Sequence, residues 1–338
     1  MLEVSLLHRW HEEAWQALMA QSGRMHHALL ITGEAGIGKL AFARHLAQSL
    51  LCESKEVQPC GQCDACHWFL AGHHPDFREL TPTPAEEGEE DGKLKKKAAT
   101  HITVEQVRDL AQFVNLTAHR GGKRVTLVHP ADALNVASAN ALLKTLEEPP
   151  EGAMFILVSS HWQRLLPTIR SRCRRFPLSK PVFAEAEQWL ADQGLERAAA
   201  YLAEAGGAPL LALESADPAR HAARDAFLGH LLDVRKLDPL ALAERLDKDK
   251  VEPARVADWL ARWVYDLSSL RLTGSIRYHP DHDASLRALS AALDPVKVMR
   301  FHDTLLDATR LAGHPLNARL VFEQLLMAYQ QMARSATR

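Results

Sequence analysis

The sequence predicts an α/β domain with a parallel sheet, followed by two domains that are entirely helical. Short apolar runs alternate with helical patterns up to about residue 180, a glycine-rich loop follows the first run, and all later patterns are helical. Strands that alternate with helices at this spacing are typical of a parallel sheet covered by helices. The length of 338 residues suits two or three domains, which we place at 1–180, 181–221 and 222–338.

The composition is that of an ordinary globular protein, with 47% hydrophobic and 24% charged residues. The formal net charge of -2 gives no general attraction to nucleic acid, so any such contact has to be local. No apolar run approaches the ~18 residues of a membrane span, and the N-terminal pattern over 8–20 predicts a helix rather than a signal peptide. We therefore expect a cytoplasmic protein with no membrane contact, whose five cysteines are not disulfides.

The first predicted strand, Ala28–Ile31, leads into a glycine-rich loop. The stretch GEAGIGKL, residues 33–40, follows this strand and opens a helix expected over 38–51. It matches the phosphate-binding pattern G-x-x-x-x-G-K-[ST] at every fixed position but the last, where Leu40 replaces the hydroxyl residue that binds Mg²⁺. The residues that keep the pattern, and that bring backbone N–H groups and a positive charge to a phosphate, are Gly33, Gly36, Gly38 and Lys39.

A second device for handling magnesium is also missing. In active ATPases of this kind the next strand ends in acidic residues that hold magnesium and activate water. Here the predicted strand Val125–Val128 is followed by His129 and Pro130, and the position of Asp132 past the proline makes it a poor substitute. The two losses together favour a loop that keeps its shape without hydrolysing ATP, and we expect this chain not to bind ATP. A working ATPase is the alternative.

Four of the five cysteines lie in an insert at about residues 52–74. They are Cys52, Cys60, Cys63 and Cys66. The spacing C-x7-C-x2-C-x2-C brings four thiolates to one point, which suits a closed tetrahedral Zn²⁺ site of the structural type. Three histidines compete as ligands: His67, His73 and His74. The alternative is a set of unconnected, reduced cysteines.

Residues 81–100 have almost no apolar side chains and carry segregated charges, which predicts a solvated loop. Its basic end, Lys93–Lys97, is the part that could contact nucleic acid. Further on, Thr103 and Gln106 form a capping-box pattern at the start of a helix.

A helix is expected over 137–148, where two prolines stop it, and Met154–Val158 is expected as the third strand. The fifth cysteine, Cys173, lies in a basic segment that is typical of the edge of a sheet. Beyond residue 181 only helical periodicity remains.

The stretches ANALLKTLEEPPEGAMFILVSS, residues 139–160, and LLPTIRSRCRRF, residues 165–176, resemble the bacterial DNA polymerase III clamp-loader subunits of the AAA+ class. A four-cysteine insert after the first helix is shared by that group. The loss of the loop hydroxyl and of the acidic residues after the second strand resembles the non-hydrolysing member of the group, not its motor subunit. The resemblance follows the domain order of the whole chain, and its most specific motifs lie between residues 33 and 176.

The resemblance implies an AAA+ domain with a zinc insert, a helical lid domain and a helical collar domain. It also implies partners: the motor subunits gamma/tau, the delta subunit and, through the assembled complex, the sliding clamp and primed DNA. No polymerase active site is visible, so any polymerase activity belongs to the whole assembly. Two other functions stay open, namely a working ATP-hydrolysing subunit and a zinc-dependent DNA-binding adaptor.

The resemblance also assigns roles to single residues. Arg172 falls at the arginine finger, which reaches into the nucleotide site of a neighbouring subunit and stabilises phosphoryl transfer there. Ser160 falls where active members place a sensor of the γ-phosphate. Leu210 or Leu211 stands where the second domain carries a sensor arginine. Lys144, exposed on its helix, is a candidate for contact with DNA or a neighbouring subunit.

Overall fold

The computed structural model describes residues 7–54, 57–83, 101–119, 122–311 and 317–334. They belong to two compact units, Met1–Glu185 and Ala186–Arg338. Most of the predicted loop, residues 84–100 with Lys93–Lys97, lies outside the described residues. No helix in the described part of the chain combines the length and apolar content that crossing a membrane requires.

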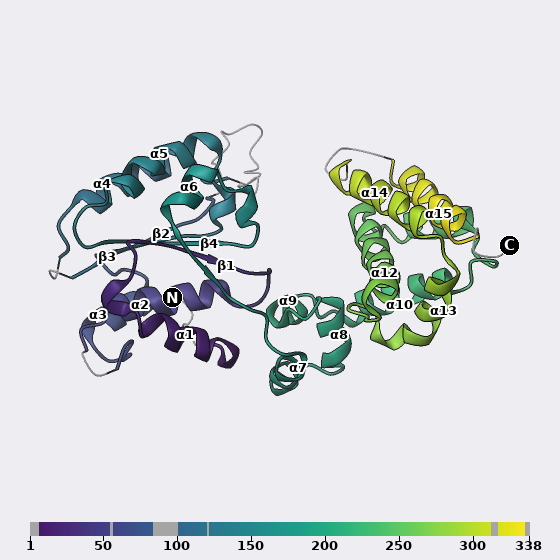
Figure 1. Ribbon diagram of the computed structural model, residues 1–338, viewed down its shortest axis with the longest axis horizontal. Coiled ribbons are helices and arrows are strands. Elements are labelled where there is room, and N and C mark those ends of the chain that lie inside the picture. Colours follow the sequence, from purple (N-terminus) through teal and green to yellow (C-terminus); the bar gives the residue numbers. More distant parts are fainter. Residues whose placement is uncertain (1–6, 55–56, 84–100, 120–121, 312–316, 335–338) are drawn as a thin grey trace, which may run out of the picture. The chain divides into compact units, whose positions relative to one another are not determined.

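The first unit is built on a five-stranded parallel sheet with the order β2-β3-β4-β1-β5 (Figure 1). The strands are β1 (Ala28–Thr32), β2 (Phe77–Leu80), β3 (Arg124–Val128), β4 (Ala153–Ser159) and β5 (Arg174–Pro177). The three predicted strands are confirmed as β1, β3 and β4, each slightly longer than expected. The prediction of a parallel α/β sheet is therefore confirmed.

Helices cover both faces of this sheet (Figure 1). One face carries α4 (Val104–Asn115), α5 (Val136–Glu147) and α6 (Pro167–Arg172), and the other carries α1 (Glu12–Met19), α2 (Lys39–Leu51) and α3 (Asp64–Ala71). Leu30, Phe155 and Leu157 of the strands pack with Leu142 of α5 in one buried cluster. The central strands β1, β3 and β4 are mostly apolar because both of their faces are buried.

Side-chain caps position the helices that lie on the sheet. The predicted capping box is confirmed at α4: Gln106 N–H donates to the Thr103 hydroxyl at 3.3 Å, and Thr103 N–H donates to Gln106 Oε1 at 2.9 Å. Asn135 Oδ1 accepts the N–H of Ser138 at 2.8 Å and so caps α5. Such caps stabilise a helix by ~1 kcal/mol each, and the one at Asn135 fixes where α5 begins.

In the second unit the described residues form helices and no strand. The helices are α8 (Ala198–Glu204), α9 (Pro209–Glu214), α10 (Pro218–Leu232), α11 (Pro239–Lys248), α12 (Pro253–Thr273), α13 (Asp283–Ala292), α14 (Pro295–Leu311) and α15 (Ala318–Arg334). They follow α7 (Phe183–Asp192), which begins at the boundary. A small buried cluster gathers around Leu190 and Leu202, and a larger one gathers around Trp263. Lid and collar domains at 181–221 and 222–338 stay a prediction.

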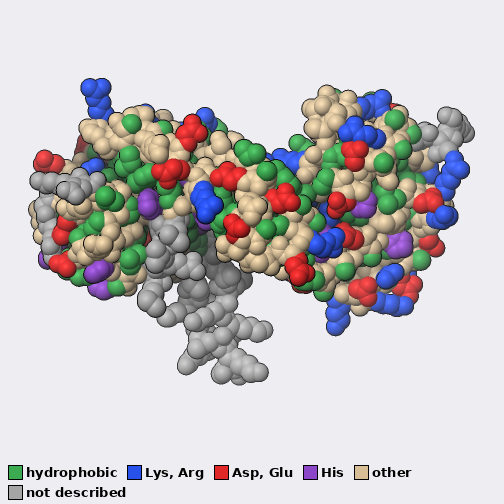
Figure 2. Space-filling view, turned by 90° about the horizontal axis from the view of Figure 1, so that it is seen from below, with side chains coloured by type: hydrophobic (Ala, Val, Ile, Leu, Met, Phe, Trp, Pro, Cys, Tyr) green, Lys and Arg blue, Asp and Glu red, His purple; other side chains and the backbone are tan. Residues whose placement is uncertain are grey.

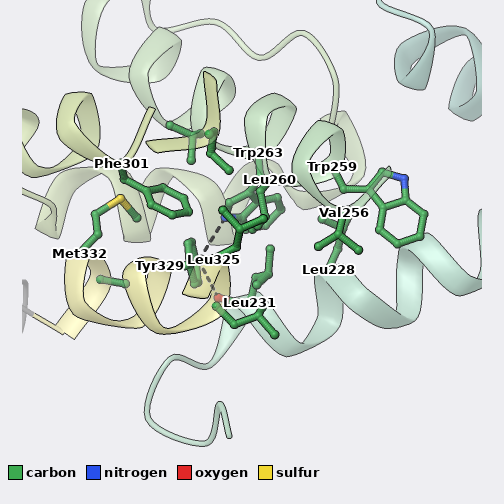
Figure 3. Packing of buried hydrophobic residues seen from close by; sticks show 14 of the residues in the cluster. Leu228, Leu231, Val256, Trp259, Leu260, Trp263, Phe301, Leu325, Tyr329 and Met332 are labelled. Carbon is green, nitrogen blue, oxygen red and sulfur yellow. Dashed lines mark hydrogen bonds between the residues drawn. The ribbon is translucent and has the colours of Figure 1, made fainter. Parts of the chain in front are cut away.

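The larger cluster surrounds a buried series of two hydrogen bonds (Figure 3). Trp263 Nε1 donates to the hydroxyl of Tyr329 at 3.2 Å, and that hydroxyl donates to the carbonyl of Leu231 at 3.0 Å. Because an unpaired polar group in a core costs ~1–3 kcal/mol, these bonds fix α10, α12 and α15 in one arrangement.

Candidate functional site

The glycine-rich loop joins β1 to α2. Gly36 and Gly38 have φ values of 73° and 94°, in the left-handed region that an L-residue adopts only with strain. Gly38 directly precedes α2, so the unpaired N–H groups of the first turn and the positive end of the helix dipole face the loop. The backbone arrangement that suits a phosphate is present, with Leu40 half-buried in place of the hydroxyl residue.

Lys39 is buried and turned back onto the loop. Its Nζ donates to the carbonyl oxygen of Glu34 at 2.5 Å, and only 6% of the residue is exposed. Burial lowers the pKa of Lys39 to about 8, although the carboxylates of Asp132 and Glu34 act in the opposite direction. The charge that a phosphate would need is thus engaged within the chain.

Three residues that precede β1 cover the loop, and we call His8, Trp10 and His11 the loop cover. The rings of His8 and Trp10 stack with centroids 4.4 Å apart and planes 3° apart. Trp10 Nε1 donates to the carbonyl of Ile37 at 2.9 Å. A Cβ atom built on Gly38 would lie 2.4 Å from Cδ2 of His8. The loop is therefore in contact with side chains of its own chain at Ile37 and Gly38.

His11 is the buried member of the loop cover. It is 1% exposed, packs edge-on against Phe42 with centroids 5.6 Å apart, and neither ring nitrogen has a hydrogen-bond partner in the described residues. Burial, with smaller contributions from the charges of His8 and Lys39, lowers the pKa of His11 to about 4. The imidazole is therefore neutral at neutral pH.

The sequence pattern placed Trp10 on a helix over 8–20, and the structure has a 3-10 turn, Arg9–His11, followed by α1. The pattern did not place these residues over the loop. The contact between Trp10 and Ile37 joins residues 27 positions apart, and such a contact leaves no local signal in a sequence.

Asp132 is the acidic residue that follows β3. It lies in a 3-10 turn, Ala131–Ala133, and its Oδ1 accepts the hydroxyl of Ser159 at 2.6 Å. Nδ1 of His161 lies 3.5 Å from Oδ2. Burial alone raises the pKa of Asp132, but the hydrogen bonds from Ser159 and His161 outweigh it and lower that pKa. Asp132 is near enough to act on Lys39. Ser160, the position that the resemblance assigns to a γ-phosphate sensor, directly follows Ser159 and is half-buried.

The four cysteines of the insert come together. Their sulfur atoms all lie within 4.8 Å of one another, and the Cys52–Cys63 and Cys60–Cys66 pairs are 3.9 Å and 4.0 Å apart. A tetrahedral Zn²⁺ with Zn–S bonds of ~2.3 Å needs sulfur atoms about 3.8 Å apart. In the described part of the chain, these four cysteines are the one group of three or more His, Cys, Asp or Glu residues that lie close enough together to hold a metal ion. No histidine belongs to the group.

Backbone donors surround these sulfur atoms. The N–H of Cys60 donates to Cys52 Sγ at 3.4 Å, that of Cys63 to Cys60 Sγ at 3.4 Å, and that of Cys66 to Cys63 Sγ at 3.5 Å. N–H donors from Gln62 and Cys63 lower the pKa of Cys60 to about 6, whereas burial raises the pKa of Cys52 and raises that of Cys66 to about 12. Donors aimed at sulfur favour thiolates, which are the form that binds metal. The residues therefore fit a structural Zn²⁺.

Arg172 ends α6, at the edge of the sheet next to β5. One terminal nitrogen pairs with Oε1 of Glu147, the last residue of α5. The other, Nη1, donates to the carbonyl of Thr168 at 3.0 Å and to the hydroxyl of Ser171 at 3.4 Å. Within the described residues these are all of its hydrogen bonds and ion pairs, so the structure does not bring Arg172 to the loop of its own chain.

The remaining predicted residues are placed simply. Lys144 is exposed on α5, and Leu210 and Leu211 are half-buried on α9. Cys173 is buried against the sheet, and burial raises the pKa of its thiol to about 12, so it is not a reactive cysteine.

The surface charges are mixed. On the face seen in Figure 2, Lys and Arg side chains of the described residues are interspersed with Asp and Glu in each unit. A face of this kind does not have the continuous basic surface that general binding to nucleic acid requires.

Comparison with known proteins identifies the family. A sequence profile described as "DNA polymerase III, delta subunit" matches residues 10–182. The chain is 34% identical to the DNA polymerase III subunit delta' of Pseudomonas aeruginosa in an alignment of 343 residues. The alignment covers 96% of this chain and 98% of that protein. This chain belongs to the DNA polymerase III delta' family. It is also 35% identical over 264 residues to subunit delta' of Escherichia coli, covering 76% of this chain and 75% of that one.

The delta' family is related in sequence to a second subunit. The Escherichia coli DNA polymerase III subunit tau is 30% identical over 336 residues, which is 90% of this chain and 50% of tau. The delta' assignment confirms the resemblance that the motifs between residues 33 and 176 carried. The Pseudomonas delta' alignment extends beyond those motifs, because it covers nearly the whole chain.

Proposed function

We propose that this chain is a non-hydrolysing subunit of the DNA polymerase III clamp loader that lends Arg172 to the ATP site of a neighbouring motor subunit. It assembles with gamma/tau and delta subunits into a ring that opens the sliding clamp and places it on primed DNA. The energy comes from ATP on the neighbour. This chain contributes a fixed geometry and one positive charge.

The observation that carries the proposal is that the glycine-rich loop is occupied by contacts with its own chain. His8 lies on Gly38, Trp10 is hydrogen-bonded to Ile37, and Lys39 is hydrogen-bonded to Glu34. A nucleotide would have to displace these contacts before its phosphates reached the backbone. Magnesium would then find Leu40 where active loops offer a hydroxyl. These features support a chain that neither binds nor hydrolyses ATP.

Arg172 suits a role in a neighbour's reaction. Its side chain is 33% exposed, and the guanidinium keeps N–H donors that its three partners do not use. An arginine is always charged, and its planar fork can bond two phosphate oxygens at once. Positioned at a transferring phosphoryl group, such a charge stabilises the transition state.

The zinc site has a structural role in this proposal. Cys52, Cys60, Cys63 and Cys66 hold Zn²⁺ with four thiolates and leave no open position for chemistry. The ion ties the end of α2 to the start of α3, because Cys52 directly follows α2 and Cys63 and Cys66 lie at the beginning of α3. The helical lid and collar domains, at 181–221 and 222–338, provide assembly surfaces.

The test is ATP turnover in the reconstituted complex with primed DNA, with wild-type chain or Arg172→Ala. We expect assembly to be unchanged and turnover at the neighbouring site to fall by about 10³. The matched control is Arg174→Ala, which removes another exposed arginine, hydrogen-bonded to Gln21, from the adjoining strand. Wild-type turnover in the Arg172→Ala complex would refute the proposed role.

One observation keeps a working ATPase as the second candidate. The carboxylate of Asp132 acts electrostatically on Lys39 and is hydrogen-bonded to Ser159 at the end of β4. An acidic residue near a phosphate loop is the kind of group that holds magnesium or activates water. ATP turnover by the isolated chain separates the two candidates.

A further inference from the structure

Arg172 has a single charged partner in the described residues, the carboxylate of Glu147. The two residues end the neighbouring helices α6 and α5, which pack against the same face of the sheet. Both side chains are accessible, with 33% of Arg172 and 47% of Glu147 exposed. The ion pair is therefore at the surface, where another anion could replace the carboxylate.

We propose that Glu147 is the counter-ion that holds Arg172 on this chain, and that the terminal phosphate of a nucleotide on the neighbouring subunit displaces it. The step is an exchange of one anion for another at the guanidinium, with no bond made or broken covalently. This inference rests on the proposed role of Arg172. It adds that Glu147 competes with the phosphate for Arg172, so that removing the Glu147 charge should by itself change the KM for ATP.

The geometry distinguishes a counter-ion from an orienting residue. Nη1 of Arg172 is bonded to Thr168 and Ser171, both on α6, and these bonds do not involve Glu147. The helix that carries the arginine therefore orients its guanidinium without α5. Glu147 contributes charge at Nη2, and it is this nitrogen that becomes available when the carboxylate leaves.

The ion pair between Arg172 and Glu147 is weak enough for a phosphate to replace the carboxylate. An ion pair between exposed side chains changes an equilibrium by about fivefold at most, because water screens both charges. A phosphate offers more negative charge and can accept two parallel N–H bonds from one guanidinium. A carboxylate left beside the incoming phosphate would repel it. Loss of the Glu147 charge should therefore make the neighbour's nucleotide bind more tightly.

The chain provides a matched control in the next residue. Glu148 is also exposed at the C-terminus of α5 and pairs with no cation in the described part of the chain. Negative charge at this end of a helix is unfavourable in both cases. Glu147→Gln and Glu148→Gln remove the same charge from the same helix end, so a difference between them reports on Arg172.

The experiment measures DNA-stimulated ATP turnover of the reconstituted complex as a function of ATP concentration. For Glu147→Gln we expect KM for ATP to fall by about two- to fivefold with kcat unchanged, and for Glu148→Gln we expect both values to stay at wild type. The added Arg172→Ala change should abolish the effect of Glu147→Gln.

Two results would overturn the inference. If Glu147→Gln has the same KM for ATP as Glu148→Gln, Glu147 does not compete with the phosphate. If Glu147→Gln has a lower kcat than wild type, Glu147 orients the arginine instead. Arg172→Ala alone separates this from the proposed function. If Arg172→Ala lowers turnover while Glu147→Gln has no effect, only the role of Glu147 is wrong, whereas wild-type turnover in Arg172→Ala refutes the finger itself.

Discussion

The imidazole of His8 lies directly against the backbone of Gly38, the last glycine of the loop before α2. A Cβ atom on Gly38 would be 2.4 Å from Cδ2 and 2.9 Å from Nε2 of that ring. Gly38 therefore has two reasons to be glycine, its positive φ of 94° and this close approach. The glycine-rich loop is therefore in contact with the loop cover of the same chain at Gly38 and at Ile37.

Gly38→Ala should destabilise the first unit by about 1–3 kcal/mol, because a left-handed L-residue costs ~1–2 kcal/mol and His8 must also move. Chemical denaturation measures the change. Gly23→Ala is the control, since nothing lies within 4 Å of a Cβ at Gly23 and its φ is not positive. That variant should stay within ~0.5 kcal/mol of wild type, and equal stability of the two variants would contradict the close approach.

Opening the loop cover should improve ATP binding without producing hydrolysis. The double variant His8→Ala, Trp10→Ala removes a hydrogen bond of ~1 kcal/mol and a ring stack of ~1 kcal/mol that a nucleotide would have to displace. Calorimetry should show ATP binding tighter than wild type by about tenfold or more. Trp162→Ala, which removes a tryptophan stacked on Arg175 instead, is the control. No gain in binding would show that the cover does not obstruct the loop.

The buried His11 should make the first unit sensitive to acid. Its pKa is about 4 in the folded chain against an ordinary 6.5, so between these values the unfolded chain binds more protons. The contribution of His11 to the free energy of unfolding therefore decreases as the pH falls from 6.5 toward 4. The total decrease is up to about 3 kcal/mol.

His11→Leu should flatten that pH dependence, which denaturation curves from neutral pH down to about 4 would measure. Replacing the exposed His101 by Gln removes a histidine that is not buried, and it should leave the slope as in wild type. An unchanged slope in His11→Leu would mean that the pKa of this imidazole is the same in the folded and the unfolded chain, which would contradict its lowering by burial.

The purified chain should contain about one Zn²⁺, held by the four cysteines. Cys63→Ser should lose the metal and lower the unfolding temperature of the first unit, because metal affinity is part of the folding free energy at such sites. Metal analysis and thermal unfolding measure both effects. Cys173→Ala, which removes the buried fifth cysteine away from the cluster, should keep the metal. Metal retained in Cys63→Ser would contradict the four-thiolate site.

The sequence predicted those parts of the fold whose signals are local. β1, β3 and β4 are central strands, so their burial on both faces leaves apolar runs that can be read directly. The capping box of α4 needs only Thr103 and Gln106, three residues apart. The spacing of the cysteines likewise indicated which sulfur atoms meet.

Other parts were missed because their cause is tertiary. β2 was not predicted: it is an edge strand, and its apolar pattern is interrupted by Arg78 and by Glu79, which pairs with Arg44 of α2 at 2.9 Å. The loop cover was missed because His8 and Gly38 meet only after folding. The partner of Arg172, Glu147, lies on another helix and has no sequence signature.

The most direct test of the central claim is ATP turnover by the isolated chain at saturating ATP and Mg²⁺, compared with Lys39→Ala. The chain has no hydroxyl at Leu40 and no acidic residue directly after β3, and Lys39 is hydrogen-bonded within its own loop. We expect no turnover above background in either protein. Turnover in the wild-type chain that Lys39→Ala abolishes would show that the loop is catalytic and would contradict the claim.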